Sequence, residues 1–176
     1  GEAYIFERSG SDWPVENRVR LVAPGRSNGD SFGNSVSLSG DGEVVAVGAP
    51  FVDNEPYGFD DRVPTGAAYK FTKNSSSSWD FSFELEAPDT QALIQLFGAT
   101  VKLNGDGSLL GIGATGKCTF NLGLGGNADF IDCGGFGATG AAYLYKNGQQ
   151  PLFINPPVAL PSGSRFGSGI DFAEDD

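Results

Sequence analysis

The feature that most constrains this chain is a repeated segment. Residues 31–50 read SFGNSVSLSGDGEVVAVGAP, and residues 96–115 read LFGATVKLNGDGSLLGIGAT. A third copy begins with RFGSGIDF at residues 165–172. Each complete copy predicts strand, tight turn and strand, because apolar runs flank a Gly-Asp-Gly sequence that tolerates the positive φ of a hairpin turn. Such a chain is expected to stack copies of one unit, since a single unit cannot bury its apolar face alone.

Other segments repeat in the same register. The sequences GEAYIF, GAAYKF and GAAYLY begin at residues 1, 66 and 140, and the first two are followed by Trp13 and Trp79. The Phe-Gly pairs of the three hairpin copies are 65 and 69 residues apart. These spacings define sequence repeats at roughly 1–65, 66–139 and an incomplete 140–176.

About four short strands in each repeat is the content of one β-propeller blade. We therefore predict an all-β fold of β-propeller blades, each with four antiparallel strands, in a single domain over residues 1–176. The chain holds about eleven predicted strands, or two and a half to three blades, and is expected to be part of a larger propeller. Because it has no Met and opens and closes inside a repeat, we interpret it as a piece of a longer or processed chain.

The apolar pattern predicts how some strands are covered. Val36 and Leu38 alternate with serines, which is typical of a strand with one buried face. Residues 44–47 are continuously apolar and predict a strand covered on both faces, as do residues 1–8. Pro50 cannot donate to a strand ladder, so pairing is expected to end there.

The repeated motifs resemble the FG-GAP repeat, the propeller repeat also found at the head of integrin alpha subunits. The residues that carry the resemblance are Phe32, Gly33, Gly48, Ala49 and Pro50 in the first copy, Phe97 and Gly98 in the second, and Phe166 and Gly167 at the start of the third. The resemblance implies a propeller in an extracellular or cell-surface protein.

The repeated aromatic residues are interpreted as structural. Phe32, Phe97 and Phe166 are expected to be wedges between neighbouring blades. The equivalent tyrosines, Tyr4, Tyr69 and Tyr143, are expected to need a partner for the hydroxyl group. Carbohydrate stacking on Trp13 or Trp79 is the alternative.

Calcium binding is a possibility that two stretches raise. Integrin-like members carry a calcium loop in the hairpin turn, but here only Asp41 or Asp106 remains, and Ca²⁺ takes six to eight oxygen ligands. The turns are therefore expected to be plain hairpins. The richer candidate is the loop after the first hairpin. Its candidate ligands are Asp53, Asn54, Glu55, Asp60 and Asp61. The alternative is that this acidic loop is simply solvated and binds no metal.

Two further site predictions come from single motifs. Cys118 and Cys133 flank a Gly-rich insert and predict a disulfide in an extracellular setting, with two free thiols as the alternative. Asn74-Ser75-Ser76 is an N-glycosylation sequon in a serine-rich turn, or an ordinary polar turn.

Charge and composition exclude several functions. The formal net charge of −11 argues against a nucleic-acid partner and against docking on anionic lipid. No apolar run is long enough to span a membrane as a helix. The chain has no His, so the usual Ser-His or Cys-His catalytic pairs are unavailable, and we predict no catalytic residues and no enzyme activity within it.

Three functions remain open at this point. The first is a non-catalytic extracellular propeller segment that mediates adhesion or protein assembly. Its partner would be a protein, a glycan, the remaining blades of its own chain or other copies of it, contacted through the loops at 51–65 and 118–133. The second is a building block of an extracellular filament or sheath. The third is the accessory propeller of a larger secreted enzyme.

Overall fold

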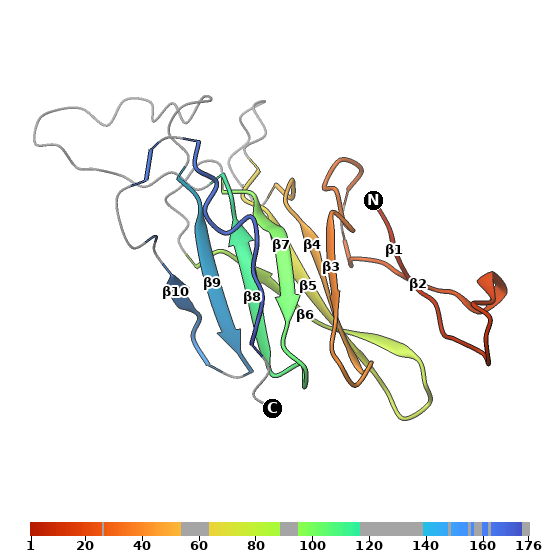
Figure 1. The fold of residues 1–176 in the computed structure, drawn as a ribbon. Helices are drawn as coiled ribbons and strands as arrows, with labels where there is room; N and C mark the ends of the chain where they lie inside the picture. The colour runs from red at the N-terminus through yellow and green to blue at the C-terminus, as the bar shows by residue number, and fades with distance from the viewer. Residues whose placement is uncertain are drawn as a thin grey trace, which may run out of the picture.

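The computed structural model shows an all-β chain of antiparallel strands in three sheets (Figure 1). It describes residues 1–25, 27–53, 64–88, 95–116, 139–147, 149–154, 156, 160–161 and 163–173. The strands are β1 (Ala3–Ile5), β2 (Val19–Leu21), β3 (Ser35–Leu38), β4 (Val44–Ala49), β5 (Ala67–Lys73), β6 (Trp79–Glu86), β7 (Phe97–Leu103), β8 (Leu109–Ala114), β9 (Ala141–Lys146) and β10 (Leu152–Ile154). A short 3₁₀ helix, η1 (Val15–Asn17), precedes β2.

The two larger sheets each contain four strands in chain order. The first sheet is β3-β4-β5-β6 and the second is β7-β8-β9-β10, while β1 and β2 pair alone as a half-sheet. In Figure 1 the second sheet lies to the left, the first in the middle and the half-sheet on the right. The prediction of four-stranded antiparallel blades is confirmed. The described residues form ten strands and not the predicted eleven or so, because residues 165–172 do not form a regular strand.

Each four-stranded sheet combines parts of two neighbouring sequence repeats. The hairpin β3–β4 belongs to the repeat at 1–65, and β5 and β6 belong to the repeat at 66–139. The two halves join because β4 pairs with β5 over six residue pairs, from Val44 with Thr72 to Ala49 with Ala67. The same join recurs between β8 and β9.

Each sheet has one face of large side chains and one face of small ones. In the first sheet, Val45, Val47 and Tyr69 face the core shared with the half-sheet. The neighbouring residues Ala46 and Ala68 face the core shared with the second sheet. Large side chains of one sheet therefore pack on small side chains of the next, and the strand at 44–47 is covered on both faces as predicted.

Glycines allow the two sheets to approach at backbone distance. A Cβ added to Gly48 would lie 1.9 Å from the carbonyl oxygen of Gly98, and one added to Gly113 would lie 2.0 Å from that of Gly167. Gly98 also has a φ of +83°, and its own Cβ would lie 2.1 Å from the carbonyl oxygen of Ala67. The Phe-Gly and Gly-Ala pairs of the repeat are thus the points of closest contact between neighbouring units.

The prediction that residues 1–8 form a strand covered on both faces is wrong for these residues. Tyr4 is 40% exposed and Phe6 is also exposed, whereas the equivalent Tyr69 is fully buried. The reason is that Tyr69 packs in the core between the first sheet and the half-sheet, whereas no described sheet covers the outer face of the half-sheet.

We expect Gly98→Ala to lower the free energy of unfolding by about 3 kcal/mol or more, since its Cβ would clash with backbone. The matched control is Gly42→Ala, which has a φ of +75° but no atom within 4 Å of an added Cβ. That variant should lose about 1 kcal/mol, from positive φ alone. Urea unfolding measures both, and equal losses would contradict the role of Gly98 in sheet contact.

Candidate interaction surfaces

The contact between the first and second sheets shows what a completed interface looks like in this fold. Phe97 is fully buried in the core between the sheets, where its ring lies 5.3 Å from that of Tyr143 in an edge-to-face arrangement. Phe32 and Tyr69 repeat this pair at 5.4 Å on the other side of the first sheet. Phe32 and Phe97 thus lie in the two cores on either side of the first sheet. Phe166 is half-buried and its backbone bridges to Gly140.

Serine side chains of the first sheet satisfy the free edge of β7. Ser35 Oγ accepts a hydrogen bond of 3.0 Å from the amide of Val101, and Ser37 Oγ accepts one of 2.9 Å from the amide of Leu103. β7 is the edge strand of the second sheet, so no strand pairs with its free edge. Without the two serines, these amides would lack a protein acceptor. The serines that alternate with Val36 and Leu38 therefore belong to a contact face, which the sequence pattern did not reveal.

The first candidate surface is the outer side of β3. Val36 and Leu38 are 59% and 55% exposed, whereas the equivalent residues of β7, Val101 and Leu103, are 4% and 3% exposed. The prediction that β3 buries its apolar face is thus wrong, although the equivalent residues of β7 are buried. The difference has a simple cause, because the first sheet covers β7 and no described residue covers β3 in the same way.

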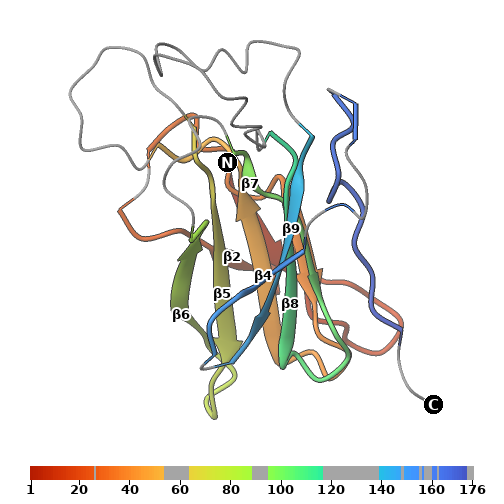
Figure 2. The same cartoon turned by 90° about the vertical axis from the view of Figure 1, so that its left-hand side faces the viewer.

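The second candidate surface lies on the far side of the second sheet. Residues 165–172 run along this sheet as β7 runs along the first: Thr100 Oγ1 donates to the Ser168 carbonyl oxygen at 3.0 Å, and Lys102 pairs with Asp171 at 3.0 Å. A cavity of about 620 Å³ remains beside this segment. The three residues of β10, the outermost strand, are all exposed. Figure 2 shows the C-terminal segment beside the second sheet, not as one of its strands.

The two surfaces therefore lie at opposite ends of the row of sheets. The half-sheet and β3 lie at one end, and β10 with residues 165–172 lies at the other (Figure 1).

The hairpin turns are held by their own side chains. Asp41 Oδ1 accepts hydrogen bonds from Ser39 Oγ at 2.5 Å and from the amide of Glu43 at 3.0 Å. Asp106 Oδ1 accepts from Asn104 Nδ2 at 2.8 Å and from the amide of Ser108 at 2.9 Å. Hydrogen bonding lowers the pKa of both carboxyl groups, foremost from the Ser39 side chain at Asp41 and from the Ser108 side chain and amide at Asp106.

Asn74, the predicted glycosylation site, closes the turn between β5 and β6. Its Oδ1 accepts from the amides of Ser76 and Ser78 at 2.9 and 3.0 Å, and its Nδ2 donates to Asp80 at 2.9 Å. Such contacts are typical of an ordinary Asn-capped turn. Glycosylation at Nδ2 stays a prediction.

Most of the predicted calcium and disulfide residues lie outside the described residues. These are Asn54, Glu55, Asp60, Asp61, Cys118 and Cys133. Asp53 is described and half-buried just before the first of these loops. Calcium binding and the disulfide stay predictions.

The two tryptophans differ in exposure. Trp79 packs against the core around the first sheet, which agrees with a structural role. Trp13 is largely exposed beside η1, so carbohydrate stacking stays open for Trp13.

Stacked four-stranded antiparallel sheets with one repeated mode of contact define a β-propeller repeat protein. Residues 15–71 match the family model of the FG-GAP repeat, so the chain carries an FG-GAP repeat. The match runs from η1 through the hairpin β3–β4 into β5. A search of the curated proteins finds no match to the chain.

Sequence reasoning missed one residue at the contact between the sheets. Lys70 in β5 is buried, and the equivalent residues of the other copies, Ile5 and Leu144, are aliphatic. An alignment of the three copies would have identified it, because a charged residue replaces an apolar one in a strand predicted to be buried.

We expect Ser37→Ala to lower the free energy of unfolding by about 1–2 kcal/mol, because the amide of Leu103 would lose its acceptor. Ser76→Ala, in the exposed turn before β6, is the control and should change it by less than about 0.5 kcal/mol. Hydrogen exchange of the Leu103 amide should speed up only in the first variant. Unchanged exchange would show that the serine does not protect this amide.

Acidification should weaken both hairpin turns. A carboxylate whose pKa is lowered in the folded state adds stability above its unfolded pKa of about 3.8, and that stability is lost as the pH falls through the folded pKa. Between pH 5 and pH 2, the free energy of unfolding should therefore fall less in an Asp41→Asn, Asp106→Asn double variant than in the wild type. Parallel pH profiles would contradict this assignment.

Proposed function

We propose that this chain is a non-catalytic, extracellular segment of a propeller that mediates protein assembly. The FG-GAP repeat supports the propeller and its setting, since such repeats are typical of extracellular domains. The non-catalytic part of the proposal rests on composition, above all on the absence of His. None of the helices in the described part of the chain is long and apolar enough to cross a membrane.

One observation carries the assembly proposal. Val36 and Leu38 are exposed although the same positions in the next copy, Val101 and Leu103, are buried by a neighbouring sheet. The packing of the first sheet on β7 is therefore an example, within this chain, of the contact that β3 lacks.

A comparison of β1 with its equivalent strand β5 also indicates what would cover this surface. β5 pairs with β4 of the preceding hairpin, β3–β4, but the equivalent edge of β1 has no partner strand among the described residues. The part that belongs there is a hairpin equivalent to β3–β4, which would pair with β1 and cover Val36 and Leu38. The second strand of that hairpin would be the one to pair with β1, as β4 pairs with β5, and residues 165–172 carry the sequence of its first strand. Because a second copy of this chain would supply that first strand, it is the partner to which we commit.

The alternative of a filament block has a specific observation in its favour. The two open surfaces differ and lie at opposite ends of the row of sheets (Figure 1). A contact between two different surfaces is heterologous, and repeating it gives a closed ring or an open polymer. Assembly size distinguishes these outcomes.

Light scattering after size-exclusion chromatography tests the proposal. The wild type should show a mass above the monomer's 18.3 kDa that grows with concentration. A Val36→Lys, Leu38→Lys double variant should stay monomeric, with its unfolding free energy changed by less than about 1 kcal/mol because both residues are exposed.

The matched control is a Ser75→Lys, Ser76→Lys double variant, which adds the same charge in the exposed turn between β5 and β6 of the first sheet and should assemble as the wild type does. A wild type that stays monomeric at high concentration would overturn the choice of a second copy as partner. Equal assembly of all three proteins would show that the outer side of β3 is not the contact.

A further inference from the structure

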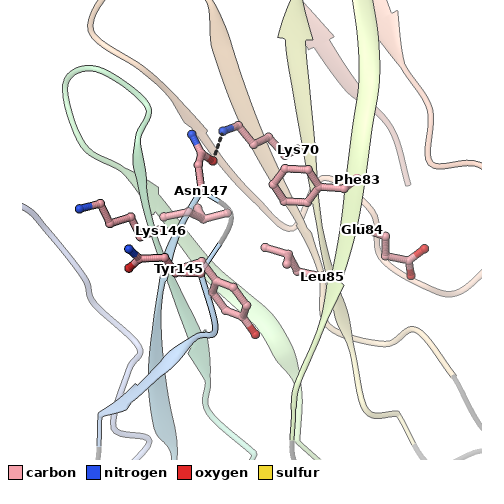
Figure 3. Close-up of a pocket in the computed structure, with 9 residues that line it drawn as sticks. Lys70, Phe83, Glu84, Leu85, Tyr145, Lys146 and Asn147 are labelled. Atoms are coloured by element: carbon pink, nitrogen blue, oxygen red, sulfur yellow. Dashed lines mark hydrogen bonds between the residues drawn. The ribbon is translucent and has the colours of Figure 1, made fainter.

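A cavity of about 340 Å³ lies between the first and second sheets, apart from the two end surfaces. Its walls come from β5 and β6 on one side and from β8, β9 and the turn after β9 on the other (Figure 3). Phe83, Leu85, Leu110 and Tyr145 form its apolar lining. Its volume and apolar walls are typical of a small-molecule site.

Among the described residues that line this cavity, Lys70 is the one charged residue that is buried, at 6% exposure. Its Nζ donates to Asn147 Oδ1 at 2.9 Å and to the carbonyl oxygen of Gly107 at 3.3 Å, and it lies 5.6 Å from the centre of the Phe83 ring. An ammonium has three donors, and both acceptors here are neutral. Lys70 forms no ion pair with any of the described residues.

The acidic groups nearest this cavity are engaged elsewhere. Glu84 lines the cavity but accepts a hydrogen bond from the Tyr69 hydroxyl at 3.2 Å, and its carboxylate points away from Lys70 in Figure 3. Asp106, beside Gly107, is bound within its own turn. The buried ammonium therefore has no neutralising carboxylate among the residues that the structure describes.

The fold itself does not require a lysine at this position. The equivalent residues, Ile5 and Leu144, stand in the same strand of the other copies. A buried charge without a counter-ion is unfavourable, and burial lowers the pKa of Lys70. A carboxylate bound beside Nζ would offset that cost.

The other polar groups at the cavity also suit a carboxylate. Lys146 is a second cation at its edge, and Asn147 and Gln149 supply amide donors. The Tyr145 hydroxyl is not available, because it donates to the Glu86 carbonyl oxygen at 3.1 Å. Two lysines at one cavity stand out on a chain with a net charge of −11.

We propose that this cavity binds a small monocarboxylate with an aromatic or branched apolar body, with the carboxylate on the free donor of Lys70 and the body against Phe83, Leu85 and Tyr145. The proposal is independent of assembly, because both walls belong to one chain. It names a class of ligand that the repeat by itself does not imply.

Calorimetric titration of the full chain with 3-phenylpropionate tests the proposal, with neutral 3-phenylpropanamide as the matched probe. The carboxylate should bind at least ten times more tightly than the amide. This comparison uses the wild type alone and does not depend on any variant folding.

Variants then assign the charge. Lys70→Met should weaken 3-phenylpropionate binding at least tenfold while unfolding at the same or a higher temperature than the wild type, since other copies carry aliphatic residues there. Lys73→Met, which removes the half-buried partner of Glu7, is the control and should leave binding unchanged. Equal affinity for both probes, or no binding of either, would overturn the proposal. Lys70 would then serve only to link the two sheets through its hydrogen bonds to Gly107 and Asn147.

Discussion

The structure depends on the close approach of neighbouring sheets through glycine and alanine. Gly48 and Gly113 allow backbone contact with the next Phe-Gly pair, and Ala46 and Ala68 leave room for Val101 and Leu103. Large side chains on the facing sheet then fill most of the space beside these contacts. The FG and GA motifs are therefore contact points, and the aromatic pair Phe97–Tyr143 is buried because the backbones meet beside it.

This mode of packing has a direction. Each sheet presents large residues toward the preceding unit and small residues with serines toward the following one, so the two ends of any stack differ. The end at β3 exposes Val36 and Leu38, and the end at β10 exposes a groove partly filled by residues 165–172. Two ends that differ in this way are what a unit needs if it is to join others of its kind head to tail.

Lys70 shows how a repeat can acquire a site without changing its fold. The position is apolar in the other copies, and the surrounding strands keep the same register. Replacing one aliphatic residue by lysine at the contact between two sheets creates a cavity edge with a positive charge, while the packing of Phe97 and Tyr143 is untouched. The buried interface is thus a place where specificity can differ from unit to unit.

The sequence by itself determined the all-β class, the four-stranded unit and the hairpin turns, because these follow from local patterns that recur at a fixed spacing. It did not determine which residues are covered. Val36 and Val101 occupy the same position in the same pattern, yet only Val101 is buried, since burial depends on whether a neighbouring sheet is present. The cavity at Lys70 was also decided by tertiary structure, because its walls come from strands far apart in the chain. Periodicity describes one unit, whereas the surfaces and the cavity arise where two units meet or fail to meet.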